Sequence, residues 1–219
     1  MRFANSFPFL ALLACVNLPG LARPETVHCW EGTIDLPTYA LGEEDPYPPF
    51  PLVNRHQIYP YTMLDDLTER REVKTYRAVF LENEYLKAII LPDLGGRLYS
   101  LYDKAAQREV FYRNNVVKYG LVALRGAWIS GGVEFNFPNG HTVVTVSPVR
   151  WYSFNNTDGS ATVVVGGTDG VTEMHWEAAL TLRPDEARLE QHVTLFNSTP
   201  PEIQAPRNAT RPYLTTLLR

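Results

Sequence analysis

The chain has 219 residues, of which 45% are hydrophobic and 12% are aromatic, including 12 tyrosines and 4 tryptophans. This length and composition suit one domain with a single sizeable core, and the aromatic share is typical of a β-rich protein. The formal net charge of −4 offers no basic surface to a polyanion, so we expect no nucleic-acid partner.

Residues 1–22 have the features of a cleaved export signal. Arg2 is a positive start, residues 7–16 are apolar, and Gly20-Leu21-Ala22 offers small residues for cleavage. The apolar stretch is too short to span a bilayer, and no later stretch approaches the ~20 apolar residues that a spanning helix needs. We therefore expect an exported protein, periplasmic or extracellular; the alternative is a buried N-terminal element.

The two cysteines, Cys15 and Cys29, bear on anchoring and redox state. The run that ends at Cys15, Leu-Leu-Ala-Cys, loosely resembles a bacterial lipobox, so a membrane is expected as a partner only if Cys15 is lipidated. Simple secretion is the preferred interpretation, because Leu13 is bulkier than the usual residue at its position. Cleavage after Ala22 leaves Cys29 alone, so no disulfide framework is expected.

Residues 23–72 are rich in proline and tyrosine and show no sustained periodicity, which predicts an extended lead-in over the surface. Residues 73–197 are expected to form the β-sandwich domain. Stretches 73–81 and 85–91 flank a short polar connection and predict a hairpin. Further β-branched or aromatic stretches follow, separated by turn residues, and no amphipathic helix interrupts them. The further stretches expected to be strands are 97–102, 109–112, 142–146, 150–154, 162–165, 171–182 and 187–196.

The tail, residues 198–219, is rich in proline and predicts irregular structure. It agrees either with an ordinary flexible terminus or with a chain that stops or diverges before its domain is complete.

The segment Ala123–His141 concentrates the side chains that could contact a sugar. In a strand, Glu134 and Asn136 would share one face while the intervening aromatics face the core. His141 could transfer protons near neutral pH, and Trp128 could stack on a pyranose. The candidate catalytic residues are Glu134 and His141, and the candidate substrate-binding residues are Arg97, Arg125, Trp128 and Asn136.

Each of these side chains also has a structural interpretation. His141 could be a turn residue bound by backbone, Trp128 could belong to the core, and either arginine could form an ordinary salt bridge. Motifs for a P-loop, a dinucleotide fold, a zinc site and a serine-hydrolase elbow are absent from the sequence. We therefore expect no cofactor and no metal.

Two stretches, LENEYLKAIILPDLGGRLYSLYDKAAQREVFYRN and ALRGAWISGGVEFNFPNGHTVVTVSPV, closely resemble the DUF5107 family. That family is assigned to the galactose mutarotase-like supersandwich, and the resemblance runs from about residue 30 to Phe196. It implies an all-β, antiparallel fold and recognition of carbohydrate on a concave sheet face. Fold alone does not fix a reaction.

The sequence departs from the mutarotase-like pattern in two ways. It lacks the Asn-His-x-Tyr-Phe-Asn-Leu type of motif that carries a catalytic histidine in aldose epimerases, so mutarotase activity is not transferred to it. Family members also continue after the segment that corresponds to Leu195–Pro200 into further strands. The chain thus looks truncated or frame-shifted near Thr199, and the sandwich is expected to be incomplete.

The first hypothesis is an exported carbohydrate-binding domain with a saccharide ligand. A second is a glycoside hydrolase or sugar epimerase that uses Glu134 and His141 in acid/base chemistry at the anomeric carbon; a glycosidase would need a second carboxylate, which stays unassigned. A third is a structural or interaction module without chemistry, or an inactive truncated product.

Overall fold

The computed structural model describes residues 26–45, 58–138 and 140–197, and the backbone of 214–218. Within these residues the only helical element is a short 3-10 turn, η1 (Pro92–Leu94), and every ladder between strands is antiparallel. The expected all-β, antiparallel fold is confirmed. The strands are β1 (His28–Leu41), β2 (Leu67–Glu82), β3 (Leu86–Leu91), β4 (Arg97–Asp103), β5 (Arg108–Glu109), β6 (Gly120–Ala123), β7 (Gly126–Trp128), β8 (Arg150–Asn155), β9 (Ala161–Thr168), β10 (His175–Leu182), β11 (Leu189–Phe196) and β12 (Leu214–Leu218).

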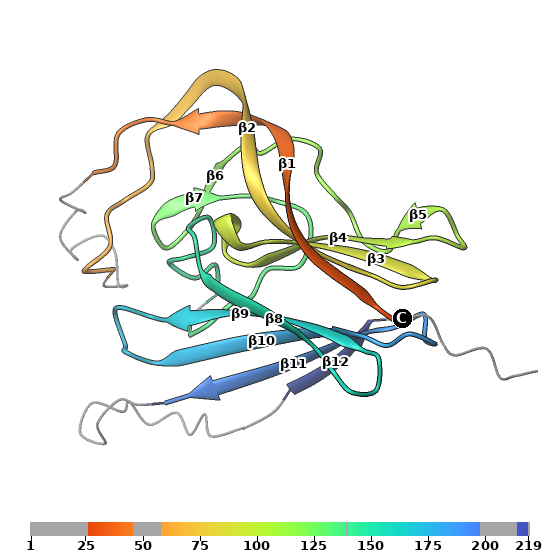
Figure 1. The fold of residues 1–219 in the computed structure, drawn as a ribbon. Coiled ribbons are helices and arrows are strands. Elements are labelled where there is room, and N and C mark those ends of the chain that lie inside the picture. The colour runs from red at the N-terminus through yellow and green to blue at the C-terminus, as the bar shows by residue number, and fades with distance from the viewer. Residues whose placement is uncertain (1–25, 46–57, 139, 198–213, 219) are drawn as a thin grey trace, which may run out of the picture.

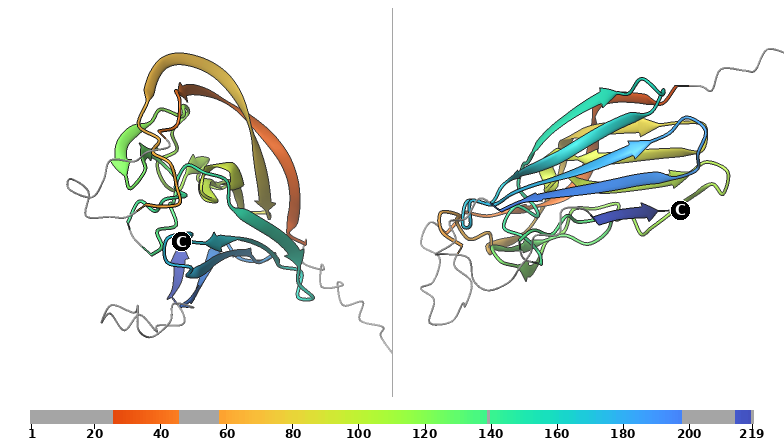
Figure 2. Two further views of the ribbon diagram at one scale, coloured as in Figure 1. Left: turned by 90° about the vertical axis from the view of Figure 1, so that its left-hand side faces the viewer. Right: turned by 90° about the horizontal axis from the view of Figure 1, so that it is seen from below.

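Two five-stranded sheets face each other. The first has the order β1-β2-β3-β4-β5 and the second β12-β11-β10-β9-β8, while β6 and β7 form a separate hairpin. Figure 1 shows the first sheet above the second, and the right-hand view of Figure 2 looks onto the second sheet from below. The main core lies between the sheets and includes Val79, Ile90, Leu98, Val163 and Leu180, all fully buried.

Strand β10 illustrates why this sequence forms a sandwich. Its residues alternate between buried and partly exposed along the whole strand, with Trp176, Ala178, Leu180 and Leu182 facing the core. Successive side chains of a strand point to opposite faces, so this alternation gives the second sheet one buried and one outer face. The outer face carries Thr162 of β9 opposite Thr181 of β10.

The expected hairpin over 73–81 and 85–91 is present as β2 and β3, which pair from Val79 with Ile90 to Glu82 with Lys87. The segment expected to be an extended lead-in differs from its prediction. Strand β1 lies within it and pairs with β2 from His28 opposite Glu82 to Leu41 opposite Leu67. In Figures 1 and 2, β1 and β2 arch together above the rest of the fold.

Pro37 is compatible with β1 because β1 is an edge strand. The carbonyl of Pro37 accepts from Val117 N, on the side away from β2. The nitrogen of the same residue faces that side too, so the missing N–H removes no bond between β1 and β2.

Two other segments expected to be strands are loops. Residues 142–146 form turns, and within 132–137 only Val133 forms a bridge, to Leu98 of β4. The tail also differs from expectation, because its residues 214–218 form β12 against β11. The proposed signal, residues 1–22 with Cys15, lies outside the described residues, as do 46–57 of the lead-in and 198–213 of the tail.

Candidate functional site

A pair of glycines brings the 130–137 loop against β4. Gly131 and Gly132 both have positive φ, and a Cβ on Gly132 would lie 2.5 Å from the carbonyl oxygen of Leu98. Only glycine adopts this backbone at so close an approach without strain. The approach, fixed by the bridge between Val133 and Leu98, places Glu134 next to Arg97 at the start of β4.

The Glu134 carboxylate is the centre of the site. Its Oε1 accepts a hydrogen bond of 2.6 Å from the Thr145 hydroxyl. Its Oε2 accepts from Trp128 Nε1 at 2.9 Å and lies 3.2 Å from His141 Nδ1. The side chain is 11% exposed, and both oxygens are engaged within the protein. Glu134 is therefore placed to orient its neighbours rather than to contact a ligand directly.

Arg97 is buried behind this carboxylate. Its Nη1 donates to the Gly131 carbonyl at 2.6 Å, and its Nη2 lies 3.8 Å from Glu134 Oε2 and 3.5 Å from the Thr145 hydroxyl. Its Nε has no hydrogen-bond partner among the described residues. Burial lowers the pKa of Arg97, and the negative charge of Glu134 opposes that effect. The guanidinium fixes the loop and compensates the carboxylate, and it does not face solvent as a ligand-binding group would.

His141 is the member of the group that reaches solvent. Its φ of 52° lies in the left-handed region, and its backbone N–H donates to Asn136 Oδ1 at 2.7 Å. Its side chain is 38% exposed and meets the Trp128 ring edge-on, with ring centroids 5.3 Å apart. With Nδ1 turned to Glu134, Nε2 has no partner among the described residues and can bind or exchange a proton with a ligand.

The sequence-predicted residues thus fall into two groups. The structure brings Arg97, Trp128, Glu134 and His141 together. Asn136 is exposed nearby, but its oxygen is engaged with the backbone of His141 and Thr142, so it shapes the turn.

Arg125 lies in another environment. Its guanidinium is buried and donates to the carbonyl and hydroxyl of Thr62 and to the Ser147 hydroxyl, at 2.6, 2.9 and 3.0 Å. Burial lowers its pKa. The hydrogen bonds of Arg125 connect two loops, which is a structural use of the side chain.

Thr145 is a site residue that the sequence did not single out. It is buried, and it holds the oxygen of Glu134 that His141 and Trp128 leave free. Its stretch of valine and threonine is typical of a strand, and nothing in that pattern distinguishes a threonine that binds a carboxylate from one that packs in a sheet.

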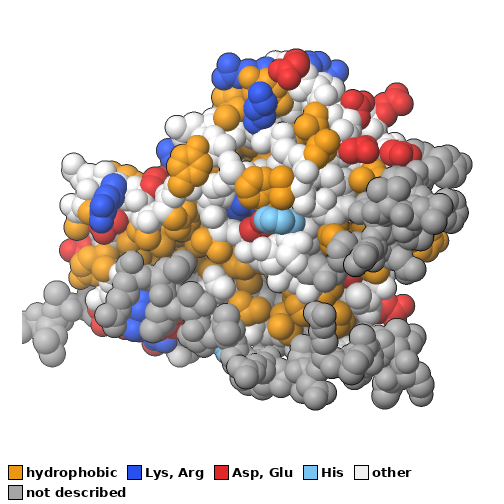
Figure 3. Space-filling model, turned by 180° about the vertical axis from the view of Figure 1, so that it is seen from behind, with side chains coloured by type: hydrophobic (Ala, Val, Ile, Leu, Met, Phe, Trp, Pro, Cys, Tyr) orange, Lys and Arg blue, Asp and Glu red, His pale blue; other side chains and the backbone are white. Residues whose placement is uncertain are grey.

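Figure 3 shows one face of the molecule with its side chains coloured by type. Near the middle of that face, a histidine adjoins acidic and basic side chains below a hydrophobic patch. Within the described ranges, no three His, Cys, Asp or Glu side chains are grouped to hold a metal ion. The same part of the chain contains no helix long and apolar enough to cross a membrane.

Comparison with known proteins gives a structural match and a family match. A crystal structure of a TPR-domain containing protein from Parabacteroides distasonis superposes with a TM-score of 0.71 at 32% sequence identity. The match covers 78% of this chain and 29% of that protein, so the chain spans less than a third of that relative's length. A family model described as a domain of unknown function matches residues 53–209, which include β2 to β11 and the whole Glu134 site. The chain therefore belongs to the DUF5107 family.

Proposed function

We propose that the chain is a carbohydrate-binding domain of galactose mutarotase-like type, with its saccharide site at His141 and Trp128. The observation that carries the proposal is the solvent-facing imidazole of His141, held by the buried carboxylate of Glu134 at 3.2 Å beside an aromatic ring. A fixed imidazole nitrogen offers a directed hydrogen bond to a hydroxyl, and an indole offers an apolar surface to a sugar ring.

The buried part of the site supports this assignment. Arg97, Glu134 and Thr145 bind each other, so a ligand does not have to replace their hydrogen bonds. A site whose contact groups are fixed before binding loses little conformational entropy when the ligand arrives. The neutral or weakly charged character of a sugar also suits a surface whose one buried arginine is balanced by one buried carboxylate.

Titration of monosaccharides against the mature chain tests the proposal. We expect binding in the wild type and its loss in His141→Ala, because the substitution removes the exposed hydrogen-bonding group. The contacts of Glu134 with Trp128, Thr145 and Arg97 stay in place in this variant. His28→Ala is the matched control, since His28 is an exposed histidine on β1. Wild-type monosaccharide affinity in His141→Ala, or no binding of any monosaccharide, would contradict a saccharide site at His141.

A second candidate is acid/base chemistry at an anomeric carbon, as in a glycoside hydrolase or a sugar epimerase. It is favoured by one observation, the contact between His141 Nδ1 and Glu134, which leaves Nε2 as the exchanging nitrogen. In this mechanism His141 carries the proton and Glu134 is a positioning residue. Polarimetry of freshly dissolved α-anomers tests the epimerase, and release of reducing sugar from oligosaccharides tests the hydrolase. A rate above buffer that is lost in His141→Asn supports the candidate, and rates equal to buffer in both assays refute it.

Export is the remaining part of the proposal. It rests on the sequence of residues 1–22, and it predicts a mature chain that begins at Arg23. Mass spectrometry of the secreted product distinguishes this start from a lipid-modified chain that begins at Cys15, and an unprocessed chain retained in the cell would refute both.

A further inference from the structure

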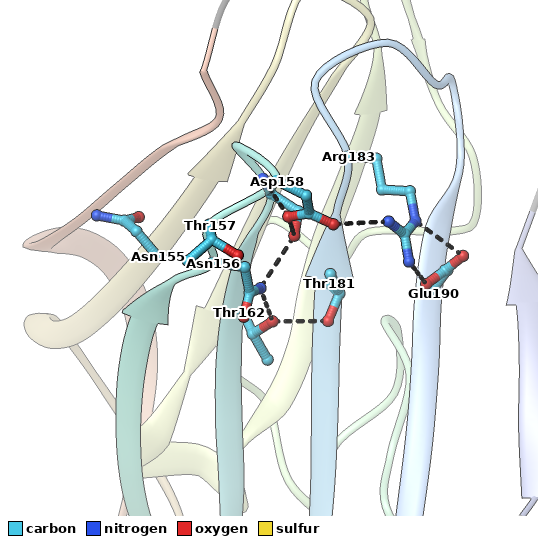
Figure 4. Close-up of a pocket in the computed structure, with 9 residues that line it drawn as sticks. Asn155, Asn156, Thr157, Asp158, Thr162, Thr181, Arg183 and Glu190 are labelled. Carbon is cyan, nitrogen blue, oxygen red and sulfur yellow. Dashed lines mark hydrogen bonds and ion pairs between the residues drawn. The ribbon is translucent and has the colours of Figure 1, made fainter.

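The outer face of the second sheet carries a polar basin, shown in Figure 4, where β8 turns into β9. Its volume is about 550 Å³, and none of its lining residues belongs to the Glu134 site. The side chains that line it are amides, hydroxyls and paired charges from β8 to β11. They include Asn155, Asn156, Asp158, Thr181, Arg183 and Glu190.

Strand register places the basin in a row across the sheet. Phe154 of β8 lies opposite Thr162 of β9, Thr162 lies opposite Thr181 of β10, and Thr181 lies opposite Glu190 of β11. Directly paired residues share one face of a sheet. Their sequence neighbours Val163 and Leu180 are buried in the core, so this row belongs to the outer face.

The floor of the basin has unused hydrogen-bonding capacity. Asn156 Nδ2 donates to the hydroxyl of Thr162 at 3.2 Å, and the hydroxyls of Thr162 and Thr181 are 2.8 Å apart. One bond between two hydroxyls uses one proton, so the other proton has no acceptor among the described residues. The carbonyl oxygen of Asn156 also has no partner among the described residues. The open groups are therefore neutral donors and acceptors.

The charged groups of the basin are satisfied by one another. Arg183 bonds Asp158 at 3.0 Å and both oxygens of Glu190 at 3.3 Å, and Arg188 bonds Glu190 at 2.8 Å. Hydrogen bonds from Ser160, together with the charge of Arg183, lower the pKa of Asp158. Arg188 also pairs with Glu186, so two guanidinium groups meet three carboxylates and the cluster carries one net negative charge. The basin therefore disfavours an anionic ligand, and its charged groups are already engaged with one another.

An aromatic surface adjoins this row. Tyr152 and Phe154, alternate residues of β8, have rings 6.2 Å apart and inclined by 21°, and they are 49% and 46% exposed. On the same face, Val164 of β9 lies opposite Tyr152 and Ala179 of β10 lies opposite Val164, so the side chains next to the two rings are small. The distance from β8 to β11 is three strand spacings, about 14 Å, which is wide enough for a sugar ring lying across the sheet.

We propose that this outer face is a second saccharide site, which binds a neutral oligosaccharide independently of the His141 site. Tyr152 and Phe154 stack on the apolar face of one sugar unit, and the amides and hydroxyls of the basin bond the hydroxyls of the next unit. A planar apolar surface beside neutral donors and acceptors matches the alternating chemistry of a pyranose chain.

Isothermal titration of the full chain with cellohexaose, xylohexaose, mannohexaose and maltohexaose, each at millimolar concentration, tests the proposal. We expect at least one to bind. Phe154→Ala should weaken that binding about three- to tenfold, from the loss of a stacking contact. Thr181→Val, which keeps the side-chain volume and removes one hydroxyl, should weaken it by about threefold or more. Circular dichroism confirms that each variant is folded.

Two matched variants assign the effect to this face. Tyr112→Ala removes an aromatic side chain that is 69% exposed outside the second sheet, and it should bind as the wild type does. His141→Ala should also keep hexasaccharide binding. The proposal is overturned if no hexasaccharide binds or if Phe154→Ala binds normally; loss of binding in His141→Ala alone would overturn it while supporting the first site.

Discussion

Replacement of Glu134 by alanine tests whether the buried ion pair organises the site. Arg97 Nη2 lies 3.8 Å from Glu134 Oε2, and the two side chains are 3% and 11% exposed. At an effective dielectric constant of about 20, this separation corresponds to an attraction of about 4 kcal/mol, offset in part by the desolvation of both groups. Removal of the carboxylate leaves the guanidinium buried without a counter-charge, which costs about 3 to 5 kcal/mol.

We expect Glu134→Ala to lower the free energy of unfolding by that amount, a large share of the roughly 5 to 15 kcal/mol typical of a domain. Glu134→Gln keeps the shape but replaces one accepting oxygen with an NH2 donor, so it should cost about 2 kcal/mol. Urea unfolding followed by circular dichroism measures both changes. Glu84→Ala, an exposed carboxylate in the β2–β3 turn, is the control and should stay within about 0.5 kcal/mol of the wild type.

The double variant separates pairing from packing. If Arg97 and Glu134 stabilise each other, Glu134→Ala combined with Arg97→Met should cost less than the sum of the two single changes. A cost below about 1 kcal/mol for Glu134→Ala, or strict additivity in the double variant, would refute the view that this pair holds the loop.

Three further predictions concern the fold. Leu180→Ala should lower the free energy of unfolding by about 2 to 5 kcal/mol in urea, because the side chain is fully buried, while Val73→Ala, 72% exposed, should have little effect. By the same measurement, Gly132→Ala should lower the free energy of unfolding by at least about 2 kcal/mol, because Gly132 has a φ of +69° and the added Cβ would lie 2.5 Å from a carbonyl oxygen. Gly140→Ala should leave the free energy of unfolding unchanged, because its added Cβ has nothing within 4 Å. Burial raises the pKa of Tyr119, so the folded state is favoured fully below the unfolded pKa of about 10 and loses up to about 1.4 kcal/mol of stability per pH unit above it. Tyr119→Phe should make this loss at alkaline pH less steep, as measured by urea midpoints at several pH values. An unchanged slope would contradict the assignment.

Local pattern was sufficient to predict the sandwich, because alternation along strands such as β10 records which face is buried. Local pattern missed β1, because a proline at position 37 argues against a strand. Pro37 is compatible with a strand only because β1 is an edge strand and the backbone groups of Pro37 face away from β2. The order of the strands in each sheet depends on contacts between distant residues, which composition does not record.

The site was predictable only in part. Glu134, His141 and Trp128 are close in sequence, so their contact follows from one loop. The role of Arg97 depends on the close approach of Gly132, 35 residues later in the chain, to β4. Residue type alone does not distinguish a buried guanidinium from an exposed one. The basin at Thr162 and Thr181 depends on register across four strands, and no stretch of sequence displays such a row.

The two buried arginines have a consequence for how this surface can vary. Arg97 and Arg125 bond main-chain carbonyls, those of Gly131 and Thr62, so the loops around His141 are fixed through backbone atoms that every residue type possesses. Exposed side chains on these loops can therefore be exchanged while the loop path stays the same. Directed evolution at such positions, with both arginines and Glu134 retained, should change ligand preference in a chain that still folds.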